Sequence, residues 1–175
     1  MGLQQHLDRL CALKYHLSWF RRKRFWRGHG VHSPFVYNMV REAFMGNKLI
    51  DGNSELFELL KNSNTGAKRT AREIQNIYTY CKHSGHTIYD SQADLSQSEM
   101  VILGRGCSEV QIQQAVAALE GSEHKAAVII SPHGSTTRHK ICMSICEKHQ
   151  GVSIDKFNIL ILVFDNHYLK QHYKI

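Results

Sequence analysis

The spacing of apolar residues divides the chain into a helical first part and a later part in which strands alternate with helices. Before residue 83, apolar side chains recur every three or four positions, which is the period of helices that bury one face. Ser33 followed by Pro34 is typical of a capped helix start. The pattern predicts helices over residues 2–27, 34–45, 54–62 and 68–82.

After Gly85 the pattern changes to short apolar runs without alternation, which is typical of strands covered on both faces. Ser108 is placed to cap a helix between two of these runs. The pattern predicts strands over residues 87–89, 100–103, 126–130, 152–157 and 159–164, and helices over residues 108–119 and 136–149.

Strands that alternate with helices favour a parallel sheet built by right-handed crossovers. The last two predicted strands leave no room for a helix between them, so we expect them to pair antiparallel. The predicted fold is α/β, with a sheet of four or five strands. We expect three parts: a basic amphipathic helical arm in residues 1–50, a helical segment packing on the core in residues 51–85, and the α/β core in residues 86–175.

The net charge of +7 lies entirely in the first 50 residues, because basic and acidic residues balance in the remainder. Residues 19–27 combine cations with aromatic side chains, which suits phosphate backbones and exposed bases. An anionic membrane surface, a protein partner, or a helix packed on the domain with its charged edge in solvent would also account for this segment. The residues concerned are Arg21, Arg22, Lys23, Arg24, Trp26 and Arg27.

The five cysteines are odd in number and form no disulfide framework, which favours a reducing compartment. The sequence shows no secretory signal, and no apolar run reaches the about 20 residues of a membrane helix. We therefore expect a cytoplasmic protein without a transmembrane segment.

Two stretches of sequence resemble a known family. Residues 27–36 read RGHGVHSPFV, and the end of the chain contains VSIDKF at 152–157, ILVF at 161–164 and KQHYKI at 170–175. The first stretch resembles the GHG(I/V)HSPFV signature of small bacterial class I SAM-dependent methyltransferase-like proteins. The second is similar to their IDLF, GLVFF and KQHF-I segments, and His133 lies where that family has DDIHWS.

This resemblance implies a reduced Rossmann-like sheet that corresponds to the C-terminal half of a methyltransferase. The family's glycine-rich SAM-binding turn and its ribose-holding acid have no counterpart in this sequence. The resemblance thus implies a truncated core and a degenerate protein without methyltransferase activity, so no cofactor is predicted; SAM would bind only if the family activity persists.

Gly104, Gly106 and Ser108 form a candidate anion site, because a glycine turn between a strand and a helix can present backbone amides to a phosphate or carboxylate. A plain strand-to-helix turn explains these residues as well. His133 follows a predicted strand and is a candidate general base. The alternative is a solvent-exposed loop histidine, because no carboxylate is nearby in sequence.

One predicted helix carries His139, Cys142, Cys146 and His149, a spacing that resembles a metal site. A single helix places about two ligands on one face, whereas zinc needs four. We therefore predict no metal, and interpret the cysteines as small core residues.

Three functions follow as hypotheses. The first is a non-catalytic methyltransferase-like protein that acts as a binding or dimerisation module. A homodimer is expected because loss of half a sheet exposes an edge, and exposed edges tend to be covered or paired. The second is an active SAM-dependent methyltransferase with a rebuilt pocket, and the third is a nucleic-acid-binding protein that uses residues 19–27.

Overall fold

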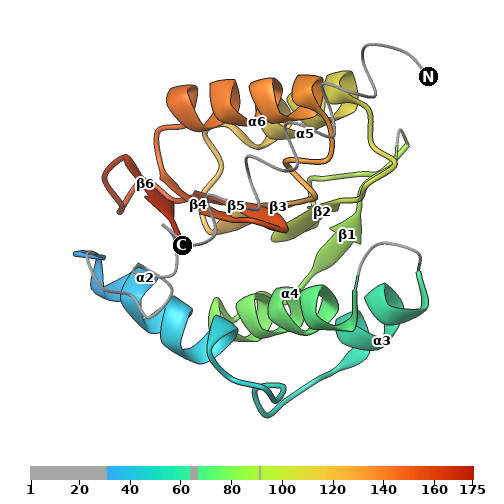
Figure 1. Ribbon diagram of the computed structural model, residues 1–175, viewed down its shortest axis with the longest axis vertical. Coiled ribbons are helices and arrows are strands. Elements are labelled where there is room, and N and C mark those ends of the chain that lie inside the picture. The colour runs from blue at the N-terminus through green and yellow to red at the C-terminus, as the bar shows by residue number, and fades with distance from the viewer. Residues whose placement is uncertain (1–30, 64–66, 91) are drawn as a thin grey trace.

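The computed structural model describes residues 31–63, 67–90 and 92–175. The predicted helix over residues 2–27 lies outside the described residues, as do Arg21, Arg22, Lys23, Arg24, Trp26 and Arg27. The described part has a mixed α/β fold compatible with a Rossmann-like arrangement, as the sequence predicted. A single sheet lies between two layers of helices, with α5 and α6 on one face and α2, α3 and α4 on the other (Figure 1).

Helices form where the apolar spacing predicted them. Ser33 and Ser135 accept hydrogen bonds from the amides of Val36 and Arg138, and Ser108 forms a capping box with Gln111. The helices are α2 (Pro34–Met39), the π-helical turn η1 (Val40–Phe44), α3 (Glu55–Asn62), α4 (Lys68–Tyr80), α5 (Glu109–Leu119) and α6 (Thr136–Lys148).

The sheet contains six strands in the order β1-β2-β3-β5-β4-β6. They are β1 (His86–Ile88), β2 (Met100–Leu103), β3 (Lys125–Ile130), β4 (Val152–Lys156), β5 (Ile159–Phe164) and β6 (Gln171–Lys174). The predicted antiparallel pairing of the last two predicted strands is confirmed, because Lys156 pairs with Ile159 across a two-residue turn. Four or five strands were expected, so β6 is an addition: it pairs parallel with β4.

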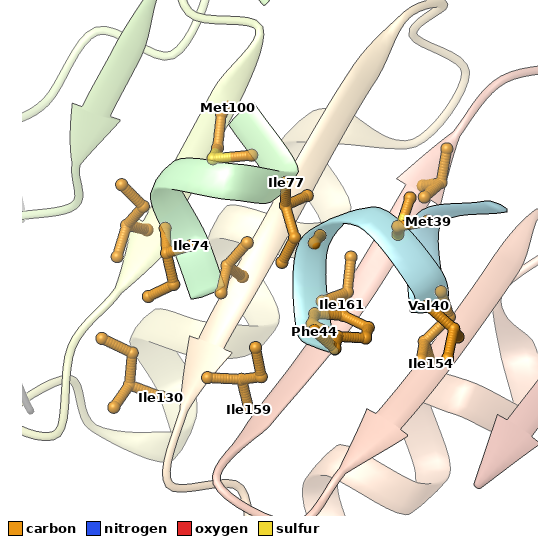
Figure 2. Packing of buried hydrophobic residues seen from close by; sticks show 14 of the residues in the cluster. Met39, Val40, Phe44, Ile74, Ile77, Met100, Ile130, Ile154, Ile159 and Ile161 are labelled. Atoms are coloured by element: carbon orange, nitrogen blue, oxygen red, sulfur yellow. The ribbon is translucent and has the colours of Figure 1, made fainter. Parts of the chain in front are cut away.

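Both faces of β2, β3 and β5 are buried, which explains why these strands lack alternation. Alternate residues of the strands face opposite helical layers; Ile154 and Ile161 pack toward η1 and α4, and Leu160 and Leu162 toward α5 and α6. Figure 2 shows the first layer, in which side chains of α2, η1 and α4 rest on the sheet. The labelled residues are Met39, Val40, Phe44, Ile74, Ile77, Met100, Ile130, Ile154, Ile159 and Ile161.

The directions of the strands place most of their carboxyl ends, and the loops that follow them, at one edge of the sheet. Strand β5 alone runs opposite to its neighbours, so the carboxyl ends of β1, β2, β3, β4 and β6 share one edge of the sheet. Open α/β sheets bind ligands at this edge. Among the described residues, no helix is long and apolar enough to cross a membrane.

Candidate functional site

A pocket of about 510 Å³ opens at the carboxyl ends of β2 and β3. Its walls come from two loops, one leading from β2 into α5 and the other from β3 into α6. Its size is within the range of small-molecule sites, about 300–1,000 Å³. The lining residues are Arg105, Cys107, Glu109, Ser131, Gly134, Ser135 and Arg138.

The guanidinium of Arg138 joins the two loops of the pocket. Its Nη1 donates to the carbonyl of Cys107 at 2.6 Å, and its Nη2 donates to the carbonyls of Gly104 at 2.9 Å and Ile130 at 3.0 Å. Its Nε donates to the carbonyl of Ser131 at 3.1 Å. These four bonds fix the ends of β2 and β3 relative to each other.

Arg138 is buried, with 6% of its surface exposed. No carboxylate of residues 31–63, 67–90 and 92–175 forms an ion pair with it. Buried charges in proteins are normally paired, so a guanidinium that meets only carbonyl dipoles leaves positive potential in the pocket wall. Arg105 adds a second, exposed cation to the same pocket.

The three predicted anion-site residues lie beside this pocket. The carbonyl of Gly104 accepts from Arg138, and a Cβ added at Gly106 would meet no atom within 4 Å, so nothing nearby requires a glycine there. The Ser108 hydroxyl accepts from the amide of Gln111. The loop thus contributes Arg105, Cys107 and Glu109 to the pocket walls, and the sequence analysis singled out none of the three.

His133 is buried, so its interpretation as a solvent-exposed loop histidine was wrong. Its Nε2 lies 3.0 Å from Oδ1 of Asp155, a fully buried carboxylate on β4. Its Nδ1 lies 2.9 Å from Nδ1 of His139. Because β3 and β4 end at the same sheet edge, the fold brings together a histidine and a carboxylate that are 22 residues apart, which the sequence analysis could not detect.

The hydrogen-bond partners indicate which ring nitrogens of His133 and His139 donate and which accept. A carboxylate accepts, so Nε2 of His133 donates to Asp155. When both imidazoles are neutral, Nδ1 of His133 then accepts from Nδ1 of His139. Two residues with positive φ flank the cluster, Ser131 at 54° and Phe157 at 28°, a conformation that costs free energy and recurs at functional sites.

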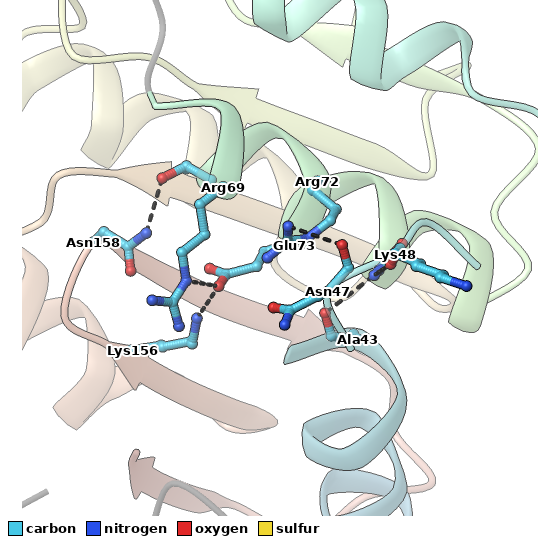
Figure 3. Close-up of polar contacts among 10 residues, drawn as sticks. Ala43, Asn47, Lys48, Arg69, Arg72, Glu73, Lys156 and Asn158 are labelled. Carbon is cyan, nitrogen blue, oxygen red and sulfur yellow. Dashed lines mark hydrogen bonds and ion pairs between the residues drawn. The ribbon is translucent and has the colours of Figure 1, made fainter. Parts of the chain in front are cut away.

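A second polar cluster lies on the other face of the sheet (Figure 3). The fully buried Glu73 of α4 accepts from Nζ of Lys156 at 2.5 Å and from Nε of Arg69 at 2.9 Å. The Lys156 ammonium also lies 4.8 Å from the centre of the Phe44 ring. Burial lowers the pKa of Lys156, and the Glu73 carboxylate opposes that shift. Asn158 donates to Oγ1 of Thr70 at 2.8 Å.

The cysteines of α6 lie in the hydrophobic core. Burial raises the pKa of Cys142 to about 11 and that of Cys146 to about 12, so both remain thiols at neutral pH. In the part of the chain that the structure describes, no group of three or more His, Cys, Asp or Glu side chains could hold a metal ion.

Comparison with known proteins gives no relative for this chain. No family model, no curated protein and no solved structure matches it.

Proposed function

We propose that this chain is a class I methyltransferase-like domain that does not transfer methyl groups and acts as a binding module for an anionic ligand. The ligand site is the pocket at the carboxyl ends of β2 and β3. The observation that carries the proposal is the buried guanidinium of Arg138, which lines this pocket without an acidic partner among the described residues.

An anion bound in this pocket would give the buried positive charge of Arg138 a negative partner. Arginine has five N–H donors, and Arg138 donates four hydrogen bonds to main-chain carbonyls. The guanidinium is therefore held in place before the ligand arrives, which reduces the entropy lost on binding. Arg105 is exposed and forms no ion pair with a carboxylate of the described residues, so it supplies a second cation.

Two features support the absence of methyl transfer. The glycine-rich turn and the ribose-holding acid that the resemblance implies have no counterpart in the sequence. SAM also has a net positive charge, since it carries a sulfonium, an ammonium and one carboxylate group, and a pocket with two arginines and one acid, Glu109, disfavours a net positive ligand. The resident side chains thus fit an anion better than they fit SAM.

Calorimetry with inorganic phosphate and with SAM tests the proposal. We expect phosphate to bind and SAM to give no heat at micromolar concentration. Arg105→Gln should weaken phosphate binding about tenfold, because it removes one charged hydrogen-bond donor. Lys140→Gln is the matched control, since Lys140 is an exposed cation of α6 outside the pocket lining. Micromolar binding of SAM without binding of phosphate would overturn the proposal.

A further inference from the structure

Glu109 gives the proposed anion pocket a carboxylate. It is the first residue of α5, half-buried, and it lines the pocket together with Arg105 and Arg138. A carboxylate repels a simple anion, and it forms no ion pair with either arginine among the described residues. A ligand that satisfies the whole pocket therefore brings hydrogen-bond donors as well as negative charge.

We infer that the ligand is a phosphate monoester of a polyhydroxy compound, such as a sugar phosphate. This inference rests on the proposed function, because it assigns a ligand class to the same pocket. The phosphate binds Arg105 and Arg138, and neighbouring hydroxyl groups of the ligand donate to the two oxygens of Glu109. In dinucleotide-binding α/β folds an Asp or Glu accepts hydrogen bonds from ribose hydroxyls in the same way.

The serine of the second loop adds a donor for the phosphate. Oγ of Ser135 accepts a hydrogen bond from the amide of Arg138 at 3.0 Å, so its own O–H is left to donate. Ser135 lines the pocket next to Arg138. Ser135 and Arg138, at the start of α6, thus carry donors for the phosphate, while Glu109, at the start of α5, carries acceptors for the hydroxyl groups.

A carboxylate at a helix start also stabilises the helix by itself, because it interacts with the positive end of the helix dipole. That role requires no ligand and changes the free energy of unfolding without changing ligand preference. The test therefore compares ligands in one variant, and thermal unfolding of the same variant measures the contribution to stability.

Calorimetry with inorganic phosphate, ribose and ribose 5-phosphate measures the preference. In the wild type we expect ribose 5-phosphate to bind about tenfold more tightly than phosphate, since two charge-assisted hydrogen bonds form to Glu109. Glu109→Gln should remove this preference, and it should bind phosphate at least as tightly as the wild type does, because it removes a negative charge from the pocket. Glu147→Gln, which changes an exposed acid of α6 outside the pocket lining, is the matched control and should keep the preference.

The outcomes separate this inference from the proposed function. If phosphate binds but ribose 5-phosphate binds no more tightly, or if Glu109→Gln keeps the preference, the inference is wrong and the anion site stands. If neither phosphate nor ribose 5-phosphate binds, both fail. Loss of the tenfold preference in Glu109→Gln alone, with Glu147→Gln unchanged, supports the inference.

Discussion

His149 is a histidine that the fold keeps neutral. Its Nε2 donates to the carbonyl of Val163 at 3.0 Å, and its Nδ1 is buried and has no partner among the described residues. Gly151 allows this approach, because a Cβ there would lie 2.2 Å from the Val163 carbonyl oxygen and 3.0 Å from Nε2 of His149. Burial lowers the pKa of His149, while the Val163 carbonyl and Glu120 oppose that shift.

This lowered pKa predicts a loss of stability in acid. The unfolded chain takes up a proton at His149 near its ordinary pKa of 6.5, whereas the folded chain does so only at lower pH. The contribution of His149 is thus fully present above pH 6.5 and is lost as the pH falls through the folded pKa. Urea unfolding at pH 8, 7 and 5.5 should show that His149→Gln loses less stability below pH 6.5 than the wild type.

Between pH 8 and pH 7, the two proteins should change in parallel, because His149 is neutral there in both the folded and the unfolded chain. An equal loss of stability in both proteins from pH 7 to pH 5.5 would contradict the lowered pKa. Half-buried His83, whose pKa is also lowered by burial, remains in both proteins and cancels in the comparison.

At the scale of elements, the ion pair between Glu73 and Lys156 joins the middle of α4 to the end of β4. Glu73 has no exposed surface, and only 14% of the Lys156 side chain is exposed. The second carboxylate oxygen of Glu73 has no partner among the described residues. Removing the lysine would therefore leave a buried carboxylate with Arg69 alone, and Arg69 is largely exposed.

We expect Lys156→Met to lower the free energy of unfolding by about 3 kcal/mol, because breaking a buried pair leaves one charge uncompensated. Adding Glu73→Leu should restore most of the loss, since apolar replacement of both partners removes the uncompensated charge. Lys61→Met is the control: its pair with Glu58 is exposed and should change stability by less than about 0.5 kcal/mol. Urea unfolding measures all four proteins, and a double variant as unstable as Lys156→Met would contradict the role of the pair.

Local chemistry explains which elements were predictable. Ser33 and Ser108 marked helix starts, and β2, β3 and β5 stood out as apolar runs because both faces of these strands are covered. Strand β6 was missed because it is a polar edge strand whose residues are alternately half-buried and exposed, so it has no apolar run. Its pairing with β4 depends on tertiary contacts that no local pattern encodes.

The sequence predicted only the edge of the sheet at which the candidate site lies. Gly104 and His133 both lie there, as strand ends of a parallel sheet should. Arg138 and Asp155 were missed because a polar residue in a helix or strand is normally exposed. Arg138 donates to Cys107, which lies 31 residues earlier in the chain, and Asp155 accepts from His133, which lies 22 residues earlier. Only the folded chain brings these partners together and buries them.

At the scale of the molecule, the described sheet ends at β1 and at β6, which pair only with β2 and β4 and contain three and four residues. Such short strands offer few backbone groups to a partner. The expected homodimer stays a prediction. The distribution of charge is the second property of the whole molecule. The entire net charge of +7 belongs to the first 50 residues.

We predict that this charge makes nucleic-acid binding steeply dependent on salt. If Arg21, Arg22, Lys23, Arg24 and Arg27 each neutralise one phosphate of a single strand, the slope of log affinity against log salt is about −3.5. Changing the first four to Gln should reduce the slope to about −0.7. Fluorescence anisotropy with a labelled 20-nucleotide single strand, from 50 to 300 mM salt, measures the slope.

The control for the arm changes four exposed lysines elsewhere to Gln: Lys61, Lys68, Lys140 and Lys148. It removes the same charge from the molecule, so general attraction falls equally in both variants while local phosphate contacts are lost only in the arm variant. We expect the control to keep a slope near the wild-type value. Equal slopes in the two variants would mean that net charge alone attracts the strand, and absence of binding at 50 mM salt would remove nucleic acid as a partner of residues 19–27.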